Sequence, residues 1–258
     1  MSANHAAFNL IFRFVENYIS PIAGRISSQR HVMAIRDGFI SAMPFMIVGS
    51  FLLVFAYPPF SPDTTWGFAR AWLDLAKEFE GRILTPFDMT MGIMSIYICA
   101  AISYNLGKHY EKSNQLDPFM CAMLSIMAFL LIAAPKTNGT LPVDSLGGTG
   151  IFTAILVAIY CVEMMRFLKA HNIGIRLPDQ VPPMIKNSFD LLIPVLVVVL
   201  TLYPLSLFIQ HHFDMLIPQA IMAIFKPLVS AADSLPAILL AVLIGHLLWF
   251  AGIHGAAI

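Results

Sequence analysis

Residues 38–57 read GFISAMPFMIVGSFLLVFAY, a stretch of twenty residues without a charged side chain. A helix needs about 20 predominantly apolar residues to cross the hydrocarbon core of a bilayer. This stretch therefore predicts a transmembrane helix, and it decides the fold class, because such a helix is typical of an all-α integral membrane protein.

The composition of the whole chain agrees with this class. Hydrophobic residues make up 58% and charged residues 12% of the 258 residues, whereas a soluble domain has about 45–50% apolar residues. Mean hydropathy is +0.77. The 15 Lys and Arg residues balance the 15 Asp and Glu residues, so no net positive charge would attract nucleic acid. We expect a lipid bilayer, and no nucleic acid, as the surroundings of this chain.

The cysteines and the amino terminus carry no further signal. Cys99, Cys121 and Cys161 each lie in a different apolar run and show no CxxC spacing, so we expect neither a metal site nor a disulfide framework. No cofactor is expected either. The start of the chain lacks the pattern of a cleaved signal peptide, and we expect it to be retained.

Five more apolar runs are long enough for spans. They cover approximately residues 86–107, 118–135, 145–163, 191–210 and 234–253. Together with residues 38–57 they predict about six transmembrane helices. The run at 145–163 begins in the glycine-rich LGGTGIF, residues 146–152, and it can be partly re-entrant where irregular backbone lines a cavity.

Two amphipathic stretches separate the chain into parts. Residues 1–30 carry apolar side chains at helical spacing with charged residues between them, which is typical of a helix at the membrane surface. Residues 213–229 show a similar pattern. We expect an amphipathic segment at 1–30, a five-span region at 31–210, an amphipathic linker at 211–234, and the start of a second unit at 235–258.

Basic residues predict the orientation, because cytoplasmic segments are enriched in Lys and Arg. A cytoplasmic amino terminus places ten of the 15 basic residues inside. These are Arg13, Arg25, Arg30, Arg36, Lys108, Lys112, Arg166, Lys169, Arg176 and Lys186. Those left outside are Arg70, Lys77, Arg82, Lys136 and Lys226.

Ionisable groups within spans are costly and are therefore functional candidates. His246 lies in the middle of the last span, where it is either a ligand-binding group or a neutral imidazole bonded to a neighbouring helix. Glu163 precedes Arg166 by three residues, which favours an i,i+3 ion pair. Asp37, in the sequence RDGF, is expected to anchor a helix start.

His254 stands between glycines in GIHG, residues 252–255. Glycine allows backbone conformations that other residues avoid, so this motif can end a helix and direct the imidazole into a cavity. A simple capping turn explains the glycines equally well. No second ligand lies at metal-binding spacing, which makes a hydrogen-bonding or proton-transfer role the functional interpretation.

Two polar stretches also suit a binding site. PKTNGTLP, residues 135–142, contains Asn138 and is expected on the outside. LPDQVPPMIKNSFDLLIP, residues 177–194, places Asn187 and Ser188 near a helix start, where free backbone N–H groups can receive hydroxyls or anions. Each of these two side chains can instead simply cap the helix.

Several stretches together resemble one family. RHVMAIRDGFISAMPFMIVGSFLLVF, LGGTGIF, LPDQVPPMIKNSF and WFAGIHG occur in order along the chain. They resemble the EIIC sugar permeases of the bacterial phosphotransferase system, of the lactose, cellobiose and diacetylchitobiose type. The resemblance implies a homodimeric permease of roughly ten spans in the cytoplasmic (inner) membrane, with dimer contacts in its amino-terminal half and sugar bound in its carboxy-terminal half.

The resemblance also implies a chemistry. His254 would be the catalytic and substrate-binding histidine beside the C6 hydroxyl of a disaccharide. Asn187, Ser188, Asn138 and His246 are further candidate sugar contacts, which rest on their own sequence context and not on the resemblance. Phosphate would come from phosphoenolpyruvate through the soluble EIIA and EIIB components, the last of which carries it on a cysteine. A partner glutamate of the family has no counterpart before Ile258, so we expect the amino-terminal part of a longer permease.

Two other functions stay open. An ion-coupled secondary transporter would use His246, Glu163 or Asp88 as coupling groups. A non-transporting membrane scaffold would need none of them.

Overall fold

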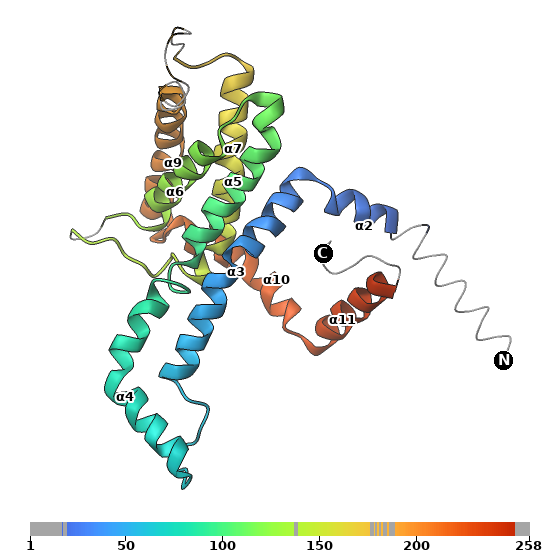
Figure 1. Cartoon of the computed structure of the whole chain (residues 1–258). Coiled ribbons are helices and arrows are strands. Elements are labelled where there is room, and N and C mark those ends of the chain that lie inside the picture. The colour runs from blue at the N-terminus through green and yellow to red at the C-terminus, as the bar shows by residue number, and fades with distance from the viewer. Residues whose placement is uncertain are drawn as a thin grey trace, which may run out of the picture. The chain divides into compact units, whose positions relative to one another are not determined.

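The computed structural model describes residues 17, 20–136, 139–175, 178, 180, 182, 185 and 189–250 (Figure 1). Every element in these ranges is a helix, and no strand occurs in them, which confirms the predicted all-α class. The elements are α2 (Ser20–Ser27), α3 (Arg30–Ala56), α4 (Gly67–Asp88), α5 (Met94–Asn114), α6 (Pro118–Ala133), the 3-10 helix η2 (Gly148–Gly150), α7 (Ile151–Ala170), α9 (Leu192–Phe213), α10 (Ile217–Ala232) and α11 (Leu235–Phe250). Of the described residues, those within 37–222 form one compact unit, and those within 1–36 and 223–258 form another.

Three of the described helices are long and apolar enough to cross a membrane. They are Arg30–Ala56, Gly148–Ala170 and Leu192–Phe213. Two shorter apolar helices, Pro118–Ala133 and Ile217–Ala232, accompany them. Of the predicted amphipathic stretches, residues 213–229 largely coincide with α10, whereas most of residues 1–30 lie outside the described residues.

The predicted run at 86–107 is not one continuous helix. Pro86 and Asp88 end α4, a turn follows, and α5 begins at Met94. Gly92 makes this turn possible, because a Cβ atom there would lie 2.5 Å from the carbonyl oxygen of Asp88. Hydropathy alone does not detect a break of this kind, since the residues on both sides of it are apolar.

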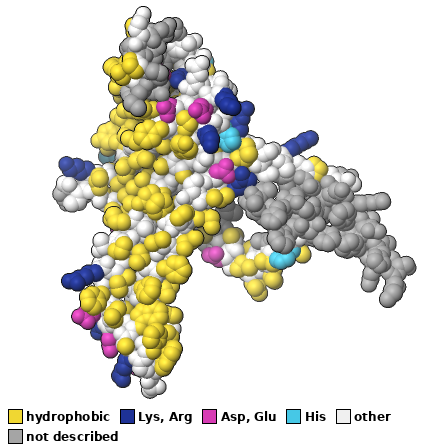
Figure 2. All heavy atoms as spheres, viewed as in Figure 1, with side chains coloured by type: hydrophobic (Ala, Val, Ile, Leu, Met, Phe, Trp, Pro, Cys, Tyr) yellow, Lys and Arg dark blue, Asp and Glu magenta, His cyan; other side chains and the backbone are white. Residues whose placement is uncertain are grey.

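Most of helix α4 lies between the predicted spans 38–57 and 86–107, where the sequence predicted no helix. Phe68, Trp72, Leu75 and Phe79 recur at helical spacing along it. Trp72 donates a hydrogen bond from Nε1 to the carbonyl oxygen of Phe55 at 3.2 Å, which ties α4 to the end of α3. Helices α3 and α4 form a helical hairpin. Figure 2 shows hydrophobic side chains gathered along this hairpin, with charged side chains at its margin.

A second contact joins the same two helices. The Tyr57 hydroxyl donates to Oε1 of Glu80 at 2.8 Å. The hydrogen bond and the negative charge of this carboxylate raise the pKa of Tyr57. The phenol therefore stays protonated to a higher pH than that of a free tyrosine.

The core of the larger unit consists of α5, α6 and α7, with α9 against α6 and α7. Small residues line the contacts, as is usual where membrane helices pack closely. A Cβ atom on Gly107 of α5 would lie 3.0 Å from Sγ of Cys121 on α6. Cys99, Cys121 and Cys161 are all free and buried in this core.

Helix α3 packs on α5 through small residues as well. A Cβ atom on Gly38 would lie 2.4 Å from the side chain of Ile102 and 2.9 Å from its backbone nitrogen. Further along, the rings of Phe45 and Tyr97 stack at 4.2 Å with an interplanar angle of 6°. Residues 38–57 thus have one face against α5, while many of their large side chains are exposed, as on a lipid-facing helix.

The glycine-rich LGGTGIF motif forms a partly buried turn, with Leu146 and Gly150 inside, that leads through η2 into α7. Ser95 of α5 donates its backbone N–H to the carbonyl oxygen of Leu146 at 2.9 Å and its hydroxyl to that of Gly147. Gly150 lies where this turn is most tightly packed, because a Cβ atom there would be 2.2 Å from the carbonyl oxygen of Ser145. These contacts satisfy irregular backbone inside the protein.

Candidate functional site

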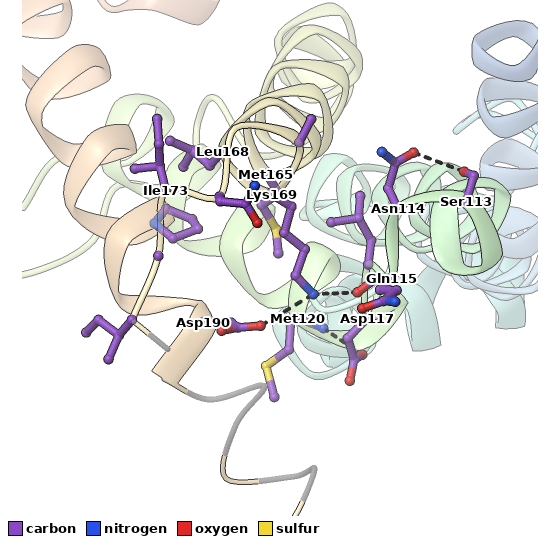
Figure 3. A pocket seen from close by; sticks show the side chains of 16 residues that line it. Ser113, Asn114, Gln115, Asp117, Met120, Met165, Leu168, Lys169, Ile173 and Asp190 are labelled. Carbon is purple, nitrogen blue, oxygen red and sulfur yellow. Dashed lines mark hydrogen bonds and ion pairs between the residues drawn. The ribbon is translucent and has the colours of Figure 1, made fainter. Parts of the chain in front are cut away.

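A cavity of about 530 Å³ lies at one end of the larger unit (Figure 3). The end of α5, the start of α6, the end of α7 and the start of α9 all contribute to its wall. Polar side chains converge there, which is the usual character of a small-molecule or docking site. They belong to Ser113, Asn114, Gln115, Asp117, Lys169, Asn172 and Asp190.

The turn between α5 and α6 has a clear local cause. Gln115 adopts the left-handed conformation with φ 53° and ends α5. Asp117 is the N-cap of α6, and its Oδ1 accepts the backbone N–H of Phe119 at 2.9 Å and that of Met120 at 3.3 Å. Pro118 follows at the first helical position, where its missing N–H costs nothing. The turn is therefore short and fixed.

Lys169 lies in the last turn of α7 and reaches two other elements across the cavity. Its Nζ donates a hydrogen bond to the carbonyl oxygen of Gln115 and lies 3.4 Å from Oδ2 of Asp190. A cation at a helix carboxy terminus also interacts favourably with the helix dipole. One ammonium group thus joins the α5–α6 turn, α7 and the start of α9.

The cavity offers hydrogen-bond donors and acceptors beside apolar walls that include Met120, Met165 and Ile173. Such a lining binds polar organic groups rather than a bare metal ion. Among the described residues, no group of three or more His, Cys, Asp or Glu side chains could hold a metal.

Most predicted site residues lie outside the described part of the chain. These are His254, Asn138, Asn187 and Ser188. His246 is described, and it lies on α11 with its Nδ1 at 2.8 Å from the carbonyl oxygen of Val242 in the same helix. The structure therefore brings none of the predicted site residues together within its described ranges.

The other ionisable candidates have local partners. Oε2 of Glu163 lies 2.6 Å from the Arg166 guanidinium, which confirms the predicted i,i+3 ion pair. The Tyr110 hydroxyl also donates to Oε1 of Glu163 at 2.7 Å. Asp37 lies inside α3 rather than at its start, because α3 begins at Arg30, so its expected role as a helix-start anchor is wrong.

Sequence reasoning missed the cavity. In the sequence, Lys169 contributes only one basic residue to the prediction of orientation, Gln115 carries no motif, and Asp190 lies in the polar stretch 177–194 without being singled out there. The one available signal is a lysine six residues after a predicted span, followed by a polar stretch that leads into the next predicted span.

The comparisons with known proteins agree with this architecture. A family model described as "Phosphotransferase system, EIIC" matches residues 36–258. The cellobiose-specific EIIC component of Geobacillus stearothermophilus is 33% identical over 263 residues, covering 95% of this chain and 56% of that protein. The lactose-specific EIICB component of Streptococcus mutans serotype c is 33% identical over 244 residues, covering 92% of this chain and 41% of that protein.

A solved structure is similar over the same range. The crystal structure of the transporter ChbC, the IIC component from the N,N'-diacetylchitobiose-specific phosphotransferase system, matches with a TM-score of 0.80 and 33% identity. The match covers 95% of this chain and 58% of that chain.

The apolar helical fold and these matches define an integral membrane protein of the phosphotransferase-system type. More particularly, the chain belongs to the phosphotransferase-system EIIC family. It spans about half the length of the curated relatives that it matches.

Proposed function

We propose that this chain is part of a permease that takes up a disaccharide and couples uptake to phosphoenolpyruvate-dependent phosphorylation. The observation that carries the proposal is the EIIC family match over residues 36–258. The relatives are named for cellobiose, lactose and diacetylchitobiose, so the substrate class is a disaccharide of this kind.

The proposed chemistry centres on His254. This imidazole orients the C6 hydroxyl of the bound sugar by a hydrogen bond. The hydroxyl oxygen attacks the phosphorus carried on a cysteine of EIIB, the S–P bond breaks, the cysteine leaves as a thiolate, and the partner glutamate of the family accepts the hydroxyl proton as general base. Asn187, Ser188, Asn138 and His246 are proposed as further sugar contacts. The name EIICB of the lactose-specific relatives supports an EIIB partner, which in turn receives its phosphate from EIIA.

The proposed assembly is a homodimer in the bacterial cytoplasmic membrane. This chain supplies about six membrane helices of a permease with roughly ten. Its five-span region at 31–210 provides dimer contacts, residues 211–234 form an interfacial linker, and residue 235 begins the sugar-binding part. Support comes from the similarity to ChbC over 95% of this chain.

We propose a cytoplasmic amino terminus, and the position of basic residues supports it. Lys108 and Lys112 lie in the second half of α5, and Arg166 and Lys169 in the last turns of α7. Both helices end at the cavity, so these cations gather toward one end of the unit. An excess of cations at one end is typical of the cytoplasmic side.

Cysteine labelling in intact cells tests this orientation. Ser113→Cys should be shielded from a membrane-impermeant maleimide, whereas Trp66→Cys in the α3–α4 turn should react. Both native side chains are exposed, and the three native cysteines are buried, so background labelling should be low. The reverse labelling pattern would contradict the proposed orientation.

Uptake measurements test the transport mechanism. Labelled disaccharide should accumulate in vesicles as a sugar phosphate only when phosphoenolpyruvate and the soluble components are supplied. Collapse of proton and sodium gradients by ionophores should leave uptake unchanged. Gradient-dependent accumulation of unmodified sugar would instead identify a secondary transporter, and failure to bind sugar would leave a membrane scaffold.

A further inference from the structure

We propose that Lys169 is a positioning residue of the permease, holding the start of α9 against the α5–α6 turn. In sequence, α9 follows shortly after Asn187 and Ser188, which are proposed above as sugar contacts, so a displaced start of α9 should weaken sugar binding. The expected effect of Lys169 on KM for sugar rests on the proposed function, whereas its expected effect on the position of α9 does not.

The geometry of Lys169 carries the proposal. Figure 3 shows interactions from its ammonium group to the carbonyl oxygen of Gln115 and to the carboxylate of Asp190. Gln115 is separated from Lys169 by 54 positions in sequence. A single side chain of α7 therefore connects two elements that local sequence does not join.

The electrostatics explain why this residue is a lysine. The carbonyl of Gln115 lies at the carboxy-terminal end of α5, where the helix dipole is negative. Asp190 supplies a full negative charge on the other side. An ammonium group between them satisfies both acceptors, and a neutral side chain of the same length would satisfy neither.

The start of α9 has little other packing on this side. Phe189 is 41% exposed and Leu192 is 51% exposed. Asp190 and Leu191 are only partly buried, and the first buried residue of α9 is Pro194, which also borders the cavity. Because little apolar surface is buried before Pro194, the ionic contact contributes to fixing this first turn. Deeper in the unit, α9 packs against α6 and α7, so loss of Lys169 should not unfold the helix.

Arg166 offers a matched control on the same helix. It is a basic residue one turn earlier, and its guanidinium pairs with Glu163 of α7 itself. It also lies 4.9 Å from the ring centroid of Tyr110 on α5, but neither contact involves α9. Removing the charge of Arg166 therefore tests whether loss of any positive charge near the cavity has the same effect as loss of the charge of Lys169.

The experiment measures the distance between nitroxide labels at Ser113→Cys and Phe189→Cys by pulsed electron paramagnetic resonance in the complete permease. Both side chains are exposed. Lys169→Met should broaden the distance distribution, Lys169→Arg should keep it narrow, and Arg166→Met should also keep it narrow. Asp190→Asn, which removes the opposite charge, should broaden it as Lys169→Met does.

Sugar phosphorylation provides the second measurement. Lys169→Met should raise KM for the disaccharide severalfold while retaining kcat, and Lys169→Arg should restore KM. A distribution for Lys169→Met as narrow as that of the wild type would overturn the proposal, as would equal broadening by Arg166→Met. If the wild-type permease phosphorylates no sugar, the proposed function fails, and the distance measurement still decides the role of Lys169.

Discussion

Replacement of His254 by alanine is expected to remove most sugar phosphorylation by the complete permease while membrane insertion is retained. Loss of one positioned acid–base or hydrogen-bonding group should lower the rate by roughly 10²–10⁴-fold. His254 lies outside the described residues, and the expectation comes from the GIHG motif, whose glycines permit a turn that presents the imidazole to a cavity. The measurement is kcat for disaccharide phosphorylation at equal amounts of inserted protein.

His246→Ala is the matched control for this prediction. The imidazole of His246 interacts with the carbonyl oxygen of Val242 in its own helix. Its removal should therefore cause a smaller defect, and any loss should follow the amount of assembled protein. Near wild-type phosphorylation by His254→Ala would show that the histidine only ends a helix.

Gly150→Leu is expected to prevent assembly of the α5–α6–α7 core. A Cβ atom at this position would lie 2.2 Å from the carbonyl oxygen of Ser145 and 3.0 Å from both Cζ of Phe129 and Oγ of Ser95. The first of these atoms is backbone and cannot move aside without breaking the turn into α7. Overpacking of a core typically costs about 1–3 kcal/mol, occasionally more, and here we expect the upper end or beyond.

Thermal unfolding in detergent, followed by size-exclusion chromatography, measures this effect. Gly150→Ala should already lower the melting temperature, and Gly150→Leu should leave little monodisperse protein. Gly81→Ala is the control. Gly81 lies in α4, where an added Cβ atom would have nothing within 4 Å. Alanine at this position should leave the melting temperature unchanged or raise it slightly. An unchanged melting temperature for Gly150→Ala would refute the packing described for LGGTGIF.

Some of the fold follows from the sequence because its cause is local. The uncharged run at 38–57 needs only its own composition to predict a membrane helix, and it lies almost entirely within α3. The Glu163–Arg166 pair depends on spacing along one helix. Helix α4 was missed because its charged residues lower the average hydropathy, although the spacing of Phe68, Trp72 and Leu75 already indicates an amphipathic helix.

The cavity could not be predicted in the same way. Lys169 meets Gln115 and Asp190 only after the ends of several helices have come together. No spacing rule links residues so far apart, and none of the three belongs to a recognisable motif. The left-handed conformation of Gln115 is a further property of the folded turn, because glutamine has no marked preference for it.

The most direct test of the central claim is a single-turnover phosphate transfer. Purified EIIB carrying radiolabelled phosphate on its cysteine is mixed with the complete permease in vesicles and with cellobiose, lactose or diacetylchitobiose in turn. We expect label to move from EIIB to the C6 oxygen of at least one disaccharide, only when the permease is present and without any ion gradient. Retention of all label on EIIB with every sugar, while the vesicles still accumulate unmodified disaccharide along an ion gradient, would contradict phosphorylation-coupled uptake.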